Sequence, residues 1–314
     1  MRTAFAGEAL ELAAATTQAL QRAGGMNLVR ESERDPGARD VVAKIFASLG
    51  IWDLQPRERQ LELEAAAAVC RVAGRYATPY PVAERLARPG HGGAEGLLLV
   101  EGDDGLATHG DLPLRWAVVR PDGTGATFVE AGDPARSRLG FFATRVRSTP
   151  EGVADIGGAA LLMTLQSWVL IGLLGAVLDD TLGHVKAREQ FGKRLADMQG
   201  LQFALTDAVV ALTMAEDLAK YTTWRLAEPG DHPVLVDALS LRAVTLESAE
   251  TVLRIGHQLH GAMGFCYETD VSWLSRHSHP LRRLPFGRAE TEWRVAEAIE
   301  AHGFDGLHAG TDHD

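Results

Sequence analysis

The longest apolar run of the chain predicts a buried helix. Residues 159–178 are nearly all apolar, and a run of this length is long enough to cross a membrane. Gln166 and Ser167 interrupt it, however, and acidic Asp179-Asp180 follows it. We therefore expect a helix that is buried on several sides at the centre of a bundle.

A turn and a second helix follow this run. Residues 188–202 are predicted to form the turn of a helical hairpin, in which Gly192 is available for a backbone conformation that other residues avoid. Downstream, apolar residues recur at helical spacings, which is typical of an amphipathic helix. These apolar positions are Leu201, Leu205, Val209, Leu212 and Leu218.

The rest of the C-terminal half is also predicted to be helical. Pro229-Gly230 separates two of its helices, and Pro280 and Pro285 mark a loop before the last one. By count and by apolar faces, residues 151–314 are predicted to form a four-helix bundle domain. Its helices are expected over residues 157–188, 197–227, 233–258 and 289–301.

The first half divides into two predicted domains. Residues 1–95 are predicted to form a helical domain, with helices over 5–20, 41–49 and 61–76 and a charged loop over 31–39. Residues 96–150 hold short apolar or β-branched runs separated by Gly, Asp and Pro, which predict a small middle β-domain. Its strands are expected over 97–100, 115–119, 126–129 and 141–146. The predicted fold class is α+β, mostly α.

Composition narrows the function classes. The 314 residues include 42 Asp and Glu against 31 Lys and Arg, for a net charge of −11. An acidic chain without basic runs argues against nucleic acid or a membrane surface as the main partner. Cys70 and Cys266 form neither a metal-ligand spacing nor a disulfide framework, and no secretory signal begins the chain. We expect a cytoplasmic protein without a metal site.

The predicted turn has the side chains of a nucleotide-binding site. Arg188 offers a forked donor to phosphate oxygens, Gln190 offers an amide and Phe191 a flat apolar face. The alternative is structural: an Arg and a Gln solvated at a helix end, with Phe191 packed into the bundle. Composition alone favours this structural alternative.

The order of these residues resembles the acyl-CoA dehydrogenase family. The family pattern is Arg-x-Gln-Phe-Gly, then a Gln seven residues later and an Asp in the next helix, here Arg188 to Gly192, Gln199 and Asp207. A second stretch, Gln258 to Phe265, is similar to the family's Gln-x-x-Gly-Gly-x-Gly-aromatic signature, with Ala262 in place of the second glycine. The two stretches occur in the family's order and at a similar separation, and with the three-part layout the resemblance covers roughly residues 40 to 290.

The resemblance implies FAD as the cofactor. Arg188 would meet the pyrophosphate, Phe191, Leu195 and Gln199 would line the adenine side, and the stretch from Gln258 would supply amide and backbone donors. The residues implied to bind the cofactor are Arg188, Gln190, Phe191, Gly192, Leu195, Gln199, Gln258, His260, Gly261, Ala262 and Gly264.

The chain also departs from the family. Catalytic relatives carry a glutamate base at one of two positions, which here hold Phe286 and Leu162. The segments with which relatives hold the flavin ring are absent from the short β-domain, where Trp116 is more typical of core. The glycine-rich loop of the N-terminal domain is also missing. Glu268, Glu290 and Glu292 are nearby acids that we interpret as solvated charges or helix-end partners. No catalytic residue is therefore expected on this chain.

The resemblance implies a role in a heteromer. The chain is similar to the short, base-lacking subunits of actinobacterial α2β2 acyl-CoA dehydrogenases of steroid catabolism. It would supply the adenosine-diphosphate half of an FAD site, while a longer partner subunit supplies the glutamate and the flavin-ring pocket. The implied substrate is an acyl-CoA, with a steroid-CoA as one candidate, and an electron-transfer acceptor is a further implied partner. Two alternatives stay open: a structural pseudo-subunit that binds no flavin, and a flavin monooxygenase on the same fold.

We also expect an oligomer with a partner chain. The grounds are the apolar helix over residues 159–178 and the open glycine-rich end at residues 261–264.

Overall fold

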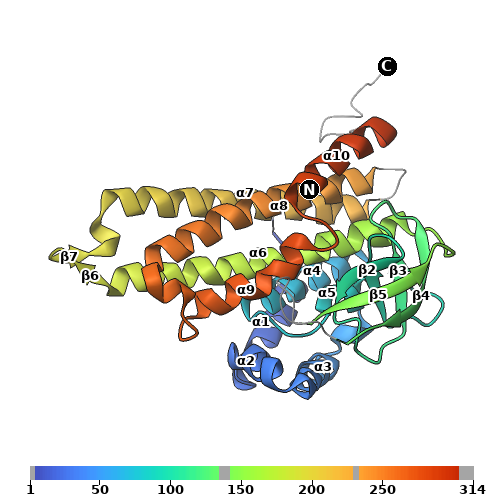
Figure 1. The fold of residues 1–314 in the computed structure, drawn as a ribbon, viewed down its shortest axis with the longest axis horizontal. Coiled ribbons are helices and arrows are strands. Elements are labelled where there is room, and N and C mark those ends of the chain that lie inside the picture. The colour runs from blue at the N-terminus through green and yellow to red at the C-terminus, as the bar shows by residue number, and fades with distance from the viewer. Residues whose placement is uncertain (1–3, 134–141, 229–232, 304–314) are drawn as a thin grey trace.

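The computed structural model describes residues 4–133, 142–228 and 233–303. In chain order these residues form short helices, a small sheet and a set of long helices (Figure 1). This arrangement confirms the predicted α+β, mostly helical fold. The N-terminal helices are α1 (Gly7–Arg22), α2 (Asn27–Arg34), α3 (Arg39–Ser48), α4 (Gln60–Arg75) and α5 (Val82–Leu86).

Helix α2 lies where the charged sequence predicted a loop, so that prediction was wrong. Its Leu28, Val29 and Ser32 are buried, whereas its charged residues lie on the other positions. The buried face is only three residues wide in an eight-residue helix. A face of three residues among so many charged ones gives no recognisable helical periodicity in the sequence.

The sheet has five strands in the order β1-β3-β4-β5-β2, with β1 and β3 parallel and the other pairs antiparallel. The strands are β1 (Gly96–Leu99), β2 (Asp104–Thr108), β3 (Trp116–Val119), β4 (Gly125–Ala131) and β5 (Ala143–Thr149). Strand β2 was not predicted, because its sequence alternates weakly and its pairing with β5 comes from tertiary structure. Residue 141, where the last strand was predicted to start, lies outside the described residues. Trp116 is buried in the sheet's own core, as predicted.

The long helices are α6 (Ile156–Ala187), α7 (Gln199–Ala227), α8 (Val234–His260), α9 (Asp270–Arg283) and α10 (Arg288–His302). Four of them were predicted, and α9 replaces the predicted loop. Pro280 lies inside α9, where a proline costs about 3 kcal/mol in a helix interior. Buried Val271, Trp273 and Leu274 offset that cost by packing on the bundle. The proline therefore marks the last turn of a helix and not a loop.

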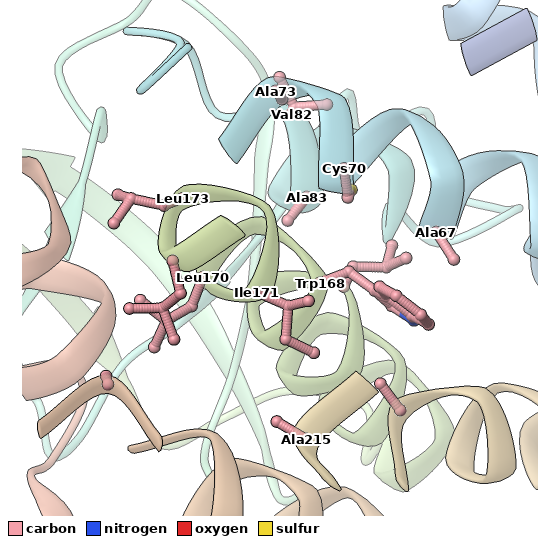
Figure 2. Close-up of a cluster of buried hydrophobic side chains, with 14 of the residues drawn as sticks. Ala67, Cys70, Ala73, Val82, Ala83, Trp168, Leu170, Ile171, Leu173 and Ala215 are labelled. Carbon is pink, nitrogen blue, oxygen red and sulfur yellow. The ribbon is translucent and has the colours of Figure 1, made fainter. Parts of the chain in front are cut away.

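Helix α6 lies at the centre of the molecule. It packs against α4, α7, α8 and α9, and Figure 2 shows Trp168 and Ile171 of α6 among side chains of the neighbouring helices. By length and composition α6 could cross a membrane, yet 78% of its most apolar window is buried inside the protein. The prediction of a buried central helix is thus confirmed. Its apolar surface is covered within the chain, so α6 gives no reason for a partner.

Candidate nucleotide-binding site

A short β-hairpin projects from the end of α6. Strands β6 (Glu189–Gln190) and β7 (Lys193–Arg194) pair across a two-residue turn at one end of the molecule (Figure 1). Both turn residues have positive φ, 52° for Phe191 and 75° for Gly192, as in the tightest hairpin turns. Gly192 thus adopts the conformation that the sequence predicted. The Phe191 ring is 91% exposed and does not pack into the bundle.

Arg188 is held by its backbone and leaves its side chain free to reach outward. Its N–H donates to the His184 carbonyl at 2.9 Å, and its carbonyl accepts from the Leu195 N–H at 2.9 Å. The side chain is exposed, and no ion pair with it occurs among the described residues. A fixed backbone with a solvent-facing guanidinium suits a phosphate contact.

The residues that follow the hairpin differ in whether a ligand could reach their side chains. Leu195 opens a 3₁₀ turn (η3, Leu195–Asp197) and is buried against the core, whereas Gln199 begins α7 and is exposed. In its observed position the Leu195 side chain supports the hairpin from beneath. Gln190 and Gln199 remain accessible to a ligand.

The second predicted segment lies at the end of α8. Gln258 is exposed, and a 3₁₀ helix, η4 (Gly261–Phe265), continues the chain. Gly261 has a φ of 59°, and a Cβ there would meet open space, as would one at Gly192. Gly264, by contrast, packs closely on His257 and His260.

A stacked pair of histidines joins the two segments. The His184 ring of α6 and the His260 ring of α8 lie 4.4 Å apart between centroids, at 26°. The His260 side chain is buried, with Nδ1 2.8 Å from the Gly256 carbonyl and Nε2 3.5 Å from Asp180 Oδ2. Its ring is therefore engaged inside the protein, and only its backbone could serve a ligand.

Sequence reasoning missed three residues of this region. Asp180 and His184 precede Arg188 by two and one turns of α6, so helical spacing from Arg188 could have found them. Phe265 stacks on His257 with centroids 4.5 Å apart and remains largely exposed. Its aromatic character was noted only as part of the motif.

The two positions expected to lack a base are buried and apolar. Phe286 packs between the guanidinium groups of Arg242 and Arg294, at 5.5 and 4.6 Å from its ring centroid. Leu162 is fully buried in α6. Of the nearby acids, Glu290 pairs with Arg294 and Glu292 with Arg288 along α10, and Glu268 is exposed.

A small cavity lies between the sheet and the bundle. It measures about 70 Å³ and is lined by residues that include Glu84, His109 and His277. Burial raises the pKa of Glu84 and lowers the pKa of His109 well below its usual value. Ligand sites for drug-sized molecules are roughly 300–1,000 Å³, so this cavity has room for water and not for a flavin ring or an acyl chain.

The match to a known family covers the helical C-terminal part of the chain. Residues 164–299 match the family model described as acyl-CoA dehydrogenase, C-terminal domain. A 3-sulfinopropanoyl-CoA desulfinase of Paraburkholderia xenovorans is 31% identical over 165 residues, which are 47% of this chain and 41% of that protein. The acyl-CoA dehydrogenase IpdE2 of Mycobacterium tuberculosis is 26% identical over 71% of this chain and 74% of its own length. The chain thus matches less than half of the first of these relatives.

Solved structures share the fold over nearly the whole chain. The ChsE4-ChsE5 complex from Mycobacterium tuberculosis has a TM-score of 0.76 and 17% identity, covering 96% of this chain and 99% of that one. The Tcur3481-Tcur3483 steroid ACAD G363A variant has a TM-score of 0.73 and 16% identity, covering 94% and 98%. At these identities the likeness shows the fold.

Proposed function

Since the chain belongs to the acyl-CoA dehydrogenase family through its C-terminal domain, we propose that it contributes half of an FAD site to a heteromeric acyl-CoA dehydrogenase. The observation that carries the proposal is the meeting of the two motif segments at one end of the bundle, joined by the His184–His260 stack. Exposed Arg188, Gln190 and Gln258 and the open backbone at Gly261 lie on these segments.

The described residues fit the adenosine-diphosphate part of FAD. An exposed arginine, side-chain amides and open glycines can bind an anionic pyrophosphate and approach it closely. The cavity between the sheet and the bundle measures only about 70 Å³ and has no room for the flavin ring. When bound, the flavin supplies a hydride acceptor for α,β-desaturation of an acyl-CoA thioester.

The partner subunit of this proposal supplies what the chain lacks. Phe286 and Leu162 stand at the two positions where relatives carry the base, so a longer subunit would contribute the glutamate and the ring pocket. Likeness to a complex of two different chains and to a steroid ACAD supports a heteromer acting on a steroid-derived acyl-CoA. An electron-transfer acceptor would reoxidise the flavin, and the protein would work in the cytoplasm.

Substitution of Arg188 tests the half-site. Hydrogen bonds to charged groups contribute about 1.5–3 kcal/mol, so Arg188→Ala should weaken FAD binding by the complex about ten- to a hundredfold. Arg188→Lys should recover part of the loss, because it keeps the charge without the fork. Fluorescence titration of FAD into the apo-complex measures both.

Arg194→Ala is the matched control, because Arg194 is exposed on the other strand of the same hairpin. It should leave FAD affinity within about threefold. If Arg188→Ala assembles with the partner and binds FAD as tightly as the wild type, Arg188 is not a phosphate ligand. The pseudo-subunit alternative would then hold.

A further inference from the structure

The His184–His260 stack couples the two segments of the proposed nucleotide site. His184 lies one helical turn before Arg188, and His260 immediately precedes Gly261. The two rings therefore form one of the contacts that align the end of α6, with its hairpin, with the end of α8, with η4.

Hydrogen-bond geometry assigns the protons of His260. A carbonyl oxygen only accepts, so the Nδ1 atom 2.8 Å from the Gly256 carbonyl carries a hydrogen. A neutral ring with that hydrogen would turn the lone pair of Nε2 toward Asp180 Oδ2, which is 3.5 Å away and also an acceptor. Both contacts are favourable when Nε2 is protonated too, and the raised pKa of His260 favours this imidazolium form.

The surroundings favour one charge on the pair and oppose two. Burial acts to lower the pKa of His260, but its bonds to Asp180 and to the Gly256 carbonyl outweigh burial and raise the pKa. Burial, then the neighbouring His260 and Arg188, lower the pKa of His184, against the attraction of Asp180. His257 of α8 also lies near the pair, and burial, then the charges of His260 and of Arg282 on α9, lower its pKa against the hydrogen bond with the Gly264 backbone.

We propose that Asp180, His184 and His260 form a positioning unit that aligns the two halves of the nucleotide site only while the histidine pair carries a single positive charge. Loss of the His260 proton leaves two acceptors facing each other at Asp180. A second proton, on His184, places two cations in a stack at 4.4 Å. Either change favours separation of the α6 and α8 ends. The inference rests on the proposed function.

The unit predicts a bell-shaped dependence on pH. His184 has a lowered pKa, so the aligned state is lost as pH falls from the unperturbed value through that lowered pKa. His260 has a raised pKa, so the aligned state is lost as pH rises through it. Alignment is therefore maximal between the two values.

Hydrogen exchange of the full chain, without nucleotide, tests the unit directly. Protection of the amides of residues 189–195 and 261–265, corrected for intrinsic exchange, should be greatest at intermediate pH and fall on both sides between about pH 5 and pH 8. Protection that is independent of pH would overturn the inference.

Two variants separate titration from packing. His184→Phe keeps a flat ring in the stack but cannot be protonated, so the acid limb should disappear while protection at intermediate pH persists. Asp180→Asn removes the carboxylate beside Nε2, so the alkaline limb should move to lower pH. An acid limb that survives in His184→Phe would overturn the assignment, and circular dichroism confirms that each variant is folded.

FAD binding to the same chain, alone and in its complex, distinguishes this inference from the proposed function. The FAD pyrophosphate is a diester of constant charge in this range, so affinity should fall about tenfold per pH unit on each limb. FAD binding with a flat pH profile would overturn the positioning unit and leave the half-site standing. A bell-shaped exchange profile with no FAD binding at any pH would contradict the half-site and leave the proton-dependent contact standing.

Discussion

Glu84 is a buried carboxyl without a cation beside it. It is 6% exposed, accepts a hydrogen bond from Gln166 Nε2 at 2.9 Å, and forms no ion pair among the described residues. Burial raises its pKa above the ordinary value of 4.5, against the opposing effect of the Gln166 bond. Glu84 therefore lowers the free energy of unfolding at every pH at which its carboxyl is ionised in the unfolded chain.

Glu84→Gln should stabilise the protein at neutral pH. A carboxyl with a raised folded pKa contributes stability below its unfolded pKa that is lost as pH rises through the folded pKa, and glutamine lacks this loss. The gain should be about 1.4 kcal/mol for each unit of the shift and should vanish below about pH 4. Urea denaturation of variant and wild type at several pH values measures it.

Glu62→Gln is the control, because it should change stability at neutral pH in the opposite direction. The Gln55 N–H donates to the Glu62 carboxylate and lowers its pKa. Its contribution is present above the unfolded pKa and lost as pH falls through the folded one, so this variant should be least stable relative to wild type at neutral pH. Parallel pH profiles for the two variants would contradict this account.

At the scale of elements, α4 and α6 pack with their backbones close together. A Cβ at Gly172 would overlap the Arg71 carbonyl oxygen, and one at Gly74 would overlap that of Val169. The two glycines face each other across the contact, so each is required by close approach and not by its conformation. This contact brings the N-terminal helices into the same core as the bundle.

Gly172→Ala should destabilise the protein by about 1–3 kcal/mol or more, because the backbone of α4 must move. The same change at Gly183, also in α6 but with nothing within 4 Å of a Cβ, should stabilise by about 0.5–1 kcal/mol through helix propensity. Chemical denaturation of both variants checks the signs. Similar changes in the free energy of unfolding at the two positions would show that helix propensity, and not the contact with α4, determines the effect.

At the scale of the whole molecule, α7 and η4 each carry several exposed apolar side chains. Phe203, Val210 and Met214 are 62%, 51% and 60% exposed and, at spacings of seven and four, lie on one stripe of α7. Met263 and Phe265 of η4 are also exposed. This surface, and not α6, supports the expectation of an oligomer.

Paired substitution of Phe203 and Met214 by Asp should therefore prevent association. Wild type should sediment as an oligomer, alone or with its partner, because water is excluded from this stripe on assembly, and the variant should sediment as a monomer. Leu10→Asp, at an exposed position on α1, should leave the oligomer intact. A wild-type chain that stays monomeric with its partner present would contradict the heteromer proposal.

Local periodicity and the order of motif residues determined most of the helices, most of the strands and the turn between α6 and α7. The apolar run at 159–178 predicted the central helix, and the short apolar or β-branched runs before it predicted most of the strands, because these signals depend on residues close in sequence. The residues from Arg188 to Gly192 predicted the turn, since a tight hairpin needs positive φ at its glycine.

Only the tertiary structure decided what depends on distant residues. Helix α9 forms despite Pro280 because its apolar face packs on α6, and β2 forms because β5 pairs with it. His184 and His260 are 76 residues apart, and their rings stack only because α6 and α8 end at the same place. Burial likewise gives Glu84 its raised pKa and turns the Leu195 and His260 side chains inward. Such properties depend on which atoms surround a residue in the folded chain, and the spacing of residues in the sequence does not predict those neighbours.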